Sequence, residues 1–156
     1  MRLLRRALIA LVGTFLALIL VAPLALYMYG LSGVDGRPER PVQMASEAEQ
    51  QRIWNQARGV GPVVIKQMNP YGYALDFFNG RVRPPAGEIL PYWIARTYLL
   101  EHRLNSGTLS WHLSSAALTI WISRNWSAEE ILTVASRTVP PDRRAPLVVP
   151  KKQEGS

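Results

Sequence analysis

The chain has 156 residues and no cysteine, which leaves room for one domain beside an anchor and excludes disulfides, thiol catalysis and cysteine-ligated metal. Its net charge of +7 is divided between an arginine-rich N-terminus, a nearly balanced central part and a basic tail. No strongly basic face is therefore expected, and nucleic acid is excluded as a partner.

Residues 7–29 form an uncharged apolar run. As a helix this run is about 34 Å long, which is enough to cross the roughly 30 Å hydrocarbon core of a bilayer. Arg2, Arg5 and Arg6 precede it, and positive charge stays on the cytoplasmic side. We therefore predict residues 1–6 in the cytoplasm, a transmembrane signal anchor at 7–29 and the rest of the chain in the periplasm.

A cleaved signal peptide is the alternative to this anchor. Such a peptide has an apolar core of about 7–15 residues, followed by small residues at the cleavage site. The run here is longer and lacks a good site of that kind. We expect a single-pass protein of the bacterial inner membrane, with the lipid bilayer as its first partner.

The remainder of the chain divides by composition. Residues 30–44 are rich in glycine, proline and charge, which predicts a linker. Residues 140–156 contain four prolines and no apolar period, which predicts a disordered tail. Residues 45–139 lie between them and are expected to form a periplasmic helical domain.

Capping boxes mark two helices in this domain. In a capping box a serine side chain caps the backbone of a residue three positions later, whose glutamate bonds back to the serine. Ser46 and Glu49 fit this pattern and open a helix predicted near 46–58. Ser127 and Glu130 fit it again and open the last helix.

Two longer helices are predicted between these, near 88–104 and 109–125. Their apolar residues recur every three or four positions, which is the spacing of one helix face. The second has apolar residues on most sides and is expected to be central. The predicted fold class is therefore mainly α: one N-terminal transmembrane helix followed by a small helical domain.

Residues 60–87 interrupt the helical pattern. Val63–Ile65 consists of β-branched residues, which is typical of a short strand. Asn69–Pro70 and Asn79–Gly80 are turn signals, and the second is able to close a hairpin. We expect a small hairpin here, between Leu75–Phe78 and Arg81–Val82.

Two segments carry a resemblance to a known family: 106–113 reads SGTLSWHL and 127–132 reads SAEEIL. They are similar to the Gly-Gly-Ser-Thr-Ile-Thr-Gln-Gln-Leu and Ser-Lys-Asp-Glu-Ile-Leu segments of the peptidoglycan glycosyltransferases, the transglycosylase domain of class A penicillin-binding proteins and their monofunctional relatives. The resemblance covers 106–135. It implies a truncated lysozyme-like fold, binding roles for Thr108, Ser110 and His112, and peptidoglycan or its lipid-linked precursor as ligand.

The chain departs from that family in the residues that carry its chemistry. The motif with the catalytic glutamate, Glu-Asp followed by an aromatic, a histidine and a glycine, is not found. Aligned back from Ser127, the Arg-Lys-x-x-Glu motif falls at 111–115, where Ser115 replaces the second carboxylate. Without a base or cations for a pyrophosphate, glycosyl transfer has no obvious source of catalysis.

Asp76 and Glu88 are the carboxylates best placed for a functional role, because they lie in or beside the irregular segment. Most other acidic residues of the domain sit in first helical turns, where the helix dipole explains them. The two histidines, His102 and His112, have no metal-ligand spacing, so neither a metal nor a cofactor is expected.

Three functional hypotheses follow. The first is a non-catalytic transglycosylase-like protein that binds peptidoglycan, its lipid-linked precursor or a cell-wall enzyme. The second is a peptidoglycan-active enzyme that uses Asp76 or Glu88. The third is a structural accessory subunit of an envelope complex.

Overall fold

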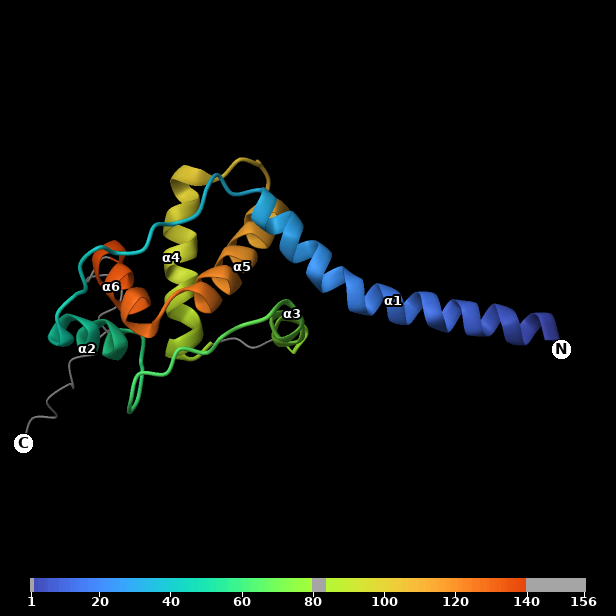
Figure 1. Cartoon of the computed structure of the whole chain (residues 1–156), viewed down its shortest axis with the longest axis horizontal. Coiled ribbons are helices and arrows are strands. Elements are labelled where there is room, and N and C mark those ends of the chain that lie inside the picture. The colour runs from blue at the N-terminus through green and yellow to red at the C-terminus, as the bar shows by residue number, and fades with distance from the viewer. Residues whose placement is uncertain (1, 80–83, 140–156) are drawn as a thin grey trace, which may run out of the picture.

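The structure is a computed structural model, and it describes residues 2–79 and 84–139. Figure 1 shows a long helix that projects from a small helical domain. The described residues form no strand and six helices, α1 Arg2–Ser32, α2 Glu47–Gln56, α3 Pro70–Phe78, α4 Ala86–His102, α5 Thr108–Asn125 and α6 Ala128–Thr138. The mainly α-helical class predicted from the sequence is confirmed.

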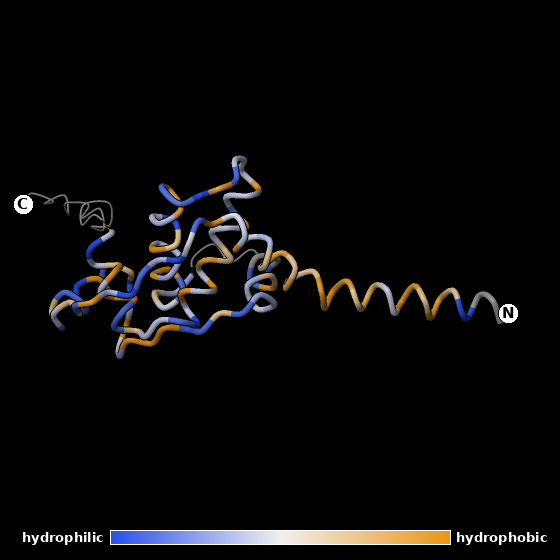
Figure 2. Tube along the Cα trace, turned by 45° about the horizontal axis from the view of Figure 1, so that its top comes forward, coloured by the Kyte–Doolittle hydropathy of each residue, from blue (hydrophilic) through white to orange (hydrophobic). Residues whose placement is uncertain are grey.

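Helix α1 contains the predicted anchor. Its segment Arg5–Ser32 is long and apolar enough to cross a membrane, and none of its most apolar part is buried against the domain. Figure 2 shows this as a nearly continuous hydrophobic stretch that ends in a hydrophilic turn at the N-terminus. An apolar helix that protein leaves uncovered over most of its length fits a single-pass membrane anchor.

The last turn of α1 packs closely against α5. A Cβ added at Gly30 would overlap the Leu113 carbonyl and approach the Ala117 side chain, and one at Gly33 would approach the Ser114 hydroxyl. Glycine therefore allows the backbones of the two helices to approach each other. The anchor is fixed to the domain by this contact.

The segment predicted as a linker follows the surface of the domain. Val34 is buried and pairs with Arg103 in an isolated antiparallel bridge. Farther along, an Arg40 guanidinium nitrogen donates to the Asn125 carbonyl at 2.6 Å, and the Ala45 N–H donates to the Thr133 hydroxyl at 3.0 Å. Residues 34–45 thus connect α1 to α2 through contacts with α4, α5 and α6.

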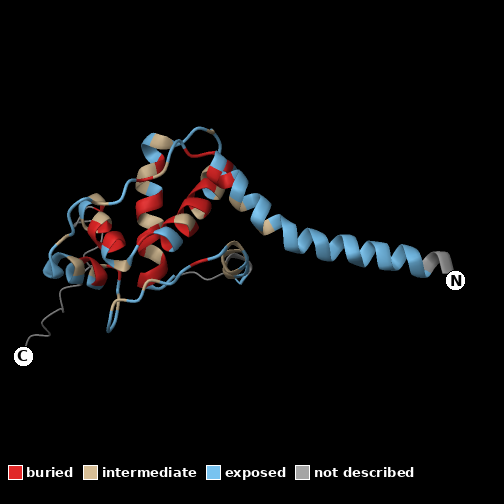
Figure 3. Cartoon of the chain, viewed as in Figure 1, coloured by how far each residue is buried: buried red, intermediate tan, exposed pale blue. Residues whose placement is uncertain are grey.

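The core of the domain lies where α4, α5, α6 and α2 meet (Figure 3). Helix α5 is central, as its apolar residues predicted. The fully buried large side chains come from all four helices, namely Ile53, Leu90, Leu99, Leu118, Ile122, Ile131 and Leu132.

Both predicted capping boxes are present. The Glu49 N–H donates to the Ser46 hydroxyl, and the Ser46 N–H donates to the Glu49 carboxylate at 3.0 Å. In the second box, the Ser127 N–H donates to the Glu130 carboxylate at 2.6 Å. Ser46 and Ser127 are therefore the N-caps of α2 and α6.

The expected hairpin is wrong, because Leu75–Phe78 lies in α3. Asn69 and Pro70 explain the difference: the Gly72 N–H donates to the Asn69 side chain at 2.8 Å, and proline is favoured at the first helical position. The pair that resembled a turn is the start of a helix. Val63–Ile65 is extended but belongs to no strand. Arg81–Val82 and the tail 140–156 lie outside the described residues.

Candidate functional site

The structure brings the two candidate carboxylates together on one lysine. The Lys66 ammonium lies 2.8 Å from a Glu88 carboxylate oxygen and 3.8 Å from an Asp76 carboxylate oxygen. The Glu88 side chain is only 9% exposed, whereas Lys66 is 55% exposed. The ion pair with Glu88 is therefore the better shielded and stronger of the two.

Close packing of residues 63–68 on α4 and α5 positions this lysine. A Cβ at Gly87 would overlap the Val64 carbonyl. The absence of a side chain at Gly87, in the first turn of α4, therefore allows residues 63–68 to cross close to the helix. Farther along, the Met68 N–H donates to the buried Ser123 hydroxyl at 3.1 Å. These two contacts hold Lys66 beside the first turn of α4, where Glu88 lies.

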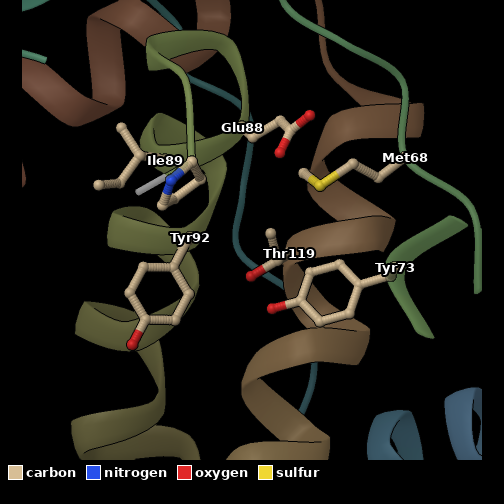
Figure 4. A pocket seen from close by; sticks show the side chains of 7 residues that line it. Met68, Tyr73, Glu88, Ile89, Tyr92 and Thr119 are labelled. Atoms are coloured by element: carbon tan, nitrogen blue, oxygen red, sulfur yellow. The ribbon is translucent and has the colours of Figure 1, made fainter. Parts of the chain in front are cut away.

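A pocket of about 330 Å³ lies next to this ion pair. Figure 4 shows Tyr92 of α4 and Tyr73 of α3 on either side of Thr119, with Glu88 and Met68 beyond them. The pocket is lined by Met68, Tyr73, Pro84, Glu88, Ile89, Tyr92 and Thr119. Its volume is at the lower end of the range for small-molecule sites.

The polar groups of the pocket have distinct roles. The Thr119 hydroxyl donates to the Ser115 carbonyl at 2.6 Å within α5. Burial raises the pKa of Tyr73, and the nearby Tyr92 and Glu88 raise it further. The Tyr73 hydroxyl therefore keeps its proton well above neutral pH and remains a hydrogen-bond donor.

The residues implied by the family resemblance lie elsewhere. Thr108 and His112 are exposed in the first turns of α5. Ser110 is buried, and its hydroxyl has no hydrogen-bond partner among the residues that the structure describes. Thr108 precedes Thr119 by eleven residues along the helix, which corresponds to about 16 Å. The structure therefore does not bring these three residues into the pocket.

Sequence reasoning found Glu88 but missed the rest of the pocket. Tyr73 was placed next to an expected hairpin, and Tyr92 and Thr119 follow no catalytic or binding motif. One signal in the sequence could have indicated Tyr73. It is three residues from Asp76, so the two share a face if a helix begins at Asn69–Pro70. Recognising that helix start would have directed attention to α3.

Neither metal binding nor relatedness gives further guidance. The described part of the chain contains no group of three or more histidine, aspartate or glutamate side chains that would hold a metal ion. In comparisons with known proteins, no family model, no curated protein and no solved structure matches the chain. The pocket, the ion pairs and the anchor are the features of the molecule that bear on its function.

Proposed function

We propose that this chain is a membrane-anchored protein of the bacterial envelope whose periplasmic domain binds the lipid-linked precursor of peptidoglycan without catalysing its transfer. The observation that carries the proposal is the pocket between α3, α4 and α5, because it combines two tyrosines and a carboxylate on the side of the domain from which α1 emerges. The similarity of 106–135 to peptidoglycan glycosyltransferases supports the choice of ligand.

The side chains of the pocket suit a sugar attached to a lipid. Tyrosine rings pack against the apolar faces of sugars, while hydroxyl and carboxylate groups bond to sugar hydroxyls. Tyr73, Tyr92 and Glu88 supply both kinds of contact. A ligand that remains in the bilayer would reach the pocket from the side of α1 and α3, which contact each other.

The ion pairs argue against catalysis. A general base must reach the proton that it abstracts, but the Glu88 carboxylate already contacts the Lys66 ammonium at 2.8 Å, and Asp76 shares the same ammonium. Because both carboxylates are paired with this cation, neither is placed to act as a base. The proposed ligand would therefore be bound and released unchanged.

Binding is tested with the full chain in lipid nanodiscs and the purified lipid-linked disaccharide-pentapeptide as probe. We expect Tyr92→Ala to weaken binding about tenfold, which corresponds to the loss of about 1.4 kcal/mol of ring contact. Leu100→Ala is the control, since Leu100 is 72% exposed and lies on α4 eight residues beyond Tyr92. Equal affinity of the two variants, or no binding by the parent chain, would overturn the proposal.

Two other results would identify the alternative hypotheses. Binding to purified sacculi but not to the precursor would point to the polymer as ligand. Recovery of a specific envelope protein after crosslinking in cells, with neither glycan bound, would indicate an accessory subunit of an envelope complex.

The enzyme hypothesis also has one observation in its favour, because Asp76 and Glu88 meet at Lys66. Hydrolysis or transfer that is lost in both Asp76→Asn and Glu88→Gln would establish it. Turnover assays of these two variants on peptidoglycan and on the lipid-linked precursor therefore separate an enzyme from a binding protein.

A further inference from the structure

One face of α3 is apolar, exposed and directed toward the anchor. Tyr71 and Leu75 are four residues apart, so they lie on the same helix face; we call it the Tyr71–Leu75 face. Tyr71 is 43% and Leu75 63% exposed. The Tyr71 hydroxyl donates to the Leu20 carbonyl of α1 at 2.8 Å. This hydrogen bond fixes the height of α3 along the anchor.

The acceptor carbonyl lies in a part of α1 that is disturbed by Pro23. Proline has no N–H and its ring crowds the preceding turn, so the Ile19 carbonyl, four residues earlier, loses its helical donor. In a bilayer, polar side chains of neighbouring elements take the place of water around such a turn. Tyr71 places a hydroxyl there, bonded to the next carbonyl along the helix, that of Leu20.

The position of Leu20 gives the depth of the contact. If the hydrocarbon core begins after Arg6, a thickness of about 30 Å is crossed by roughly 20 helical residues and ends near residue 26. Leu20 then lies about 9 Å below the outer boundary of the core. Helices that lie in a membrane interface bury their apolar faces by about 5–10 Å. The two depths agree.

The opposite side of α3 has the polarity expected for such a helix. Tyr73 is two residues from Tyr71, which turns it to the other side, and it lines the pocket. Asp76 is the only charged residue of α3, and it pairs with Lys66. Polar groups of α3 therefore contact the domain, while the Tyr71–Leu75 face is apolar and exposed.

We propose that α3 lies in the outer interface of the bilayer that α1 crosses, with the Tyr71–Leu75 face in contact with lipid acyl chains. Lipid is the occupant because the face is joined to α1 at Leu20, in the outer half of the anchor. Tyrosine is also favoured at the membrane interface, where its ring meets lipid and its hydroxyl bonds to polar groups. The domain would thus rest on the membrane at two places, α1 and α3. This inference rests on α1 crossing the membrane and is independent of what the pocket binds.

The test uses fluorescent labels on single cysteines, which the cysteine-free chain permits. The full chain is placed in phosphatidylethanolamine–phosphatidylglycerol vesicles that contain lipids with a nitroxide near the top or near the end of the acyl chain. Leu75→Cys probes the Tyr71–Leu75 face. Val60→Cys, 90% exposed and just beyond α2, is the matched control, because α2 lies on the far side of the domain from α1. Leu16→Cys reports on the anchor.

We expect the label at Leu75 to lose fluorescence mainly with the shallow nitroxide and the label at Leu16 mainly with the deep one. The label at Val60 should be unaffected by both. If the Leu16 label is quenched and the Leu75 label is no more quenched than the Val60 label, α3 is not in the interface and the inference is overturned. If the Leu16 label is not quenched either, α1 does not cross the membrane, and the proposed function loses its topology as well.

Discussion

Helices α2 and α6 lie on one side of the α4–α5 pair, and helices α1 and α3 lie on the other (Figures 1 and 3). On the first side, the core side, Ile53 and Leu132 are almost fully buried and both helices begin with a capping box. On the second, the anchor side, Leu75 is 63% exposed, and Gly30 allows the backbone of α1 to approach α5 closely. The core side excludes water from leucine and isoleucine, whereas the anchor side leaves apolar groups uncovered.

This difference indicates two environments for one domain. A surface in water does not gain from exposing a continuous apolar helix and a neighbouring leucine. A surface beside lipid gains from both, because lipid covers them. The two sides should therefore respond differently to the same substitution. Stability is measured as the free energy of unfolding in detergent micelles, from urea titrations followed by the fluorescence of buried Trp54 and Trp126.

The largest effect is expected from leucine truncation on the core side. Leu132→Ala removes a side chain that is 1% exposed, and the cavity and lost burial should lower the free energy of unfolding by about 2–5 kcal/mol. Leu75→Ala on the anchor side should change it by no more than about 0.5 kcal/mol. A similar loss for both variants would show that the Tyr71–Leu75 face is covered by protein rather than exposed.

The second prediction compares two glycines of α1. Gly30→Ala places a Cβ against the Leu113 carbonyl, and this overpacking should cost about 1–3 kcal/mol. Gly13→Ala is the control, because no atom lies within 4 Å of a Cβ there; alanine should leave the domain unchanged and favour the helix slightly. The free energies of unfolding of the two variants check this prediction. Equal values for Gly30→Ala and Gly13→Ala would contradict a close α1–α5 contact.

The core side was predictable from the sequence. Ser46 with Glu49 and Ser127 with Glu130 are local signals, and apolar residues spaced by three or four identify the faces that α4, α5 and α6 bury. Both kinds of signal act within a few residues, so neighbouring sequence is sufficient to read them. The boundaries of α2 and α6 followed directly.

The anchor side was predictable only in part. The apolar run of α1 is apparent from composition, but Leu75–Phe78 was predicted as a hairpin strand from the turn signal at Asn79–Gly80. Asn69–Pro70, which can initiate either a turn or a helix, begins α3 instead. The partnership of Lys66 with Glu88 depends on how the chain crosses α4 at Gly87, which no local pattern reports. Glu88 was identified from its place beside an irregular segment, whereas Tyr92 and Thr119 join the pocket only through tertiary packing.

The third prediction concerns Lys66. Lys66→Met removes the ammonium from Glu88, whose side chain is 9% exposed, and leaving that carboxylate without its cation should cost about 1–2 kcal/mol. The double variant Lys66→Met/Glu88→Gln should recover part of this loss, since the buried Glu88 charge is removed together with its cation. Glu88→Gln alone completes the comparison. If the loss of stability in the double variant equals the sum of the losses in Lys66→Met and Glu88→Gln, the two side chains are not coupled.

The fourth prediction compares the two capping boxes. Ser127→Ala should lower the free energy of unfolding by about 1 kcal/mol, because its partner Glu130 is buried and also lies 3.6 Å from Arg40. Ser46→Ala should cost less, about 0.5 kcal/mol, since the bonds of that box are exposed to water. The reverse order would show that α2, rather than α6, limits the stability of the core side.

The smallest effect is expected at the pocket, where it appears only in alkali. Burial raises the pKa of Tyr73 above its ordinary value of 10.0. A raised folded-state pKa means that the unfolded chain loses this proton first as the pH rises. The contribution of Tyr73 to stability is therefore fully present below pH 10 and is lost as the pH passes through the folded-state value. Between neutral pH and about pH 11 the free energy of unfolding of the parent chain should fall by more than that of Tyr73→Phe. Below about pH 9 the difference in stability between the two chains should not change with pH. Equal alkaline losses would place the Tyr73 hydroxyl in open water and remove it from the pocket.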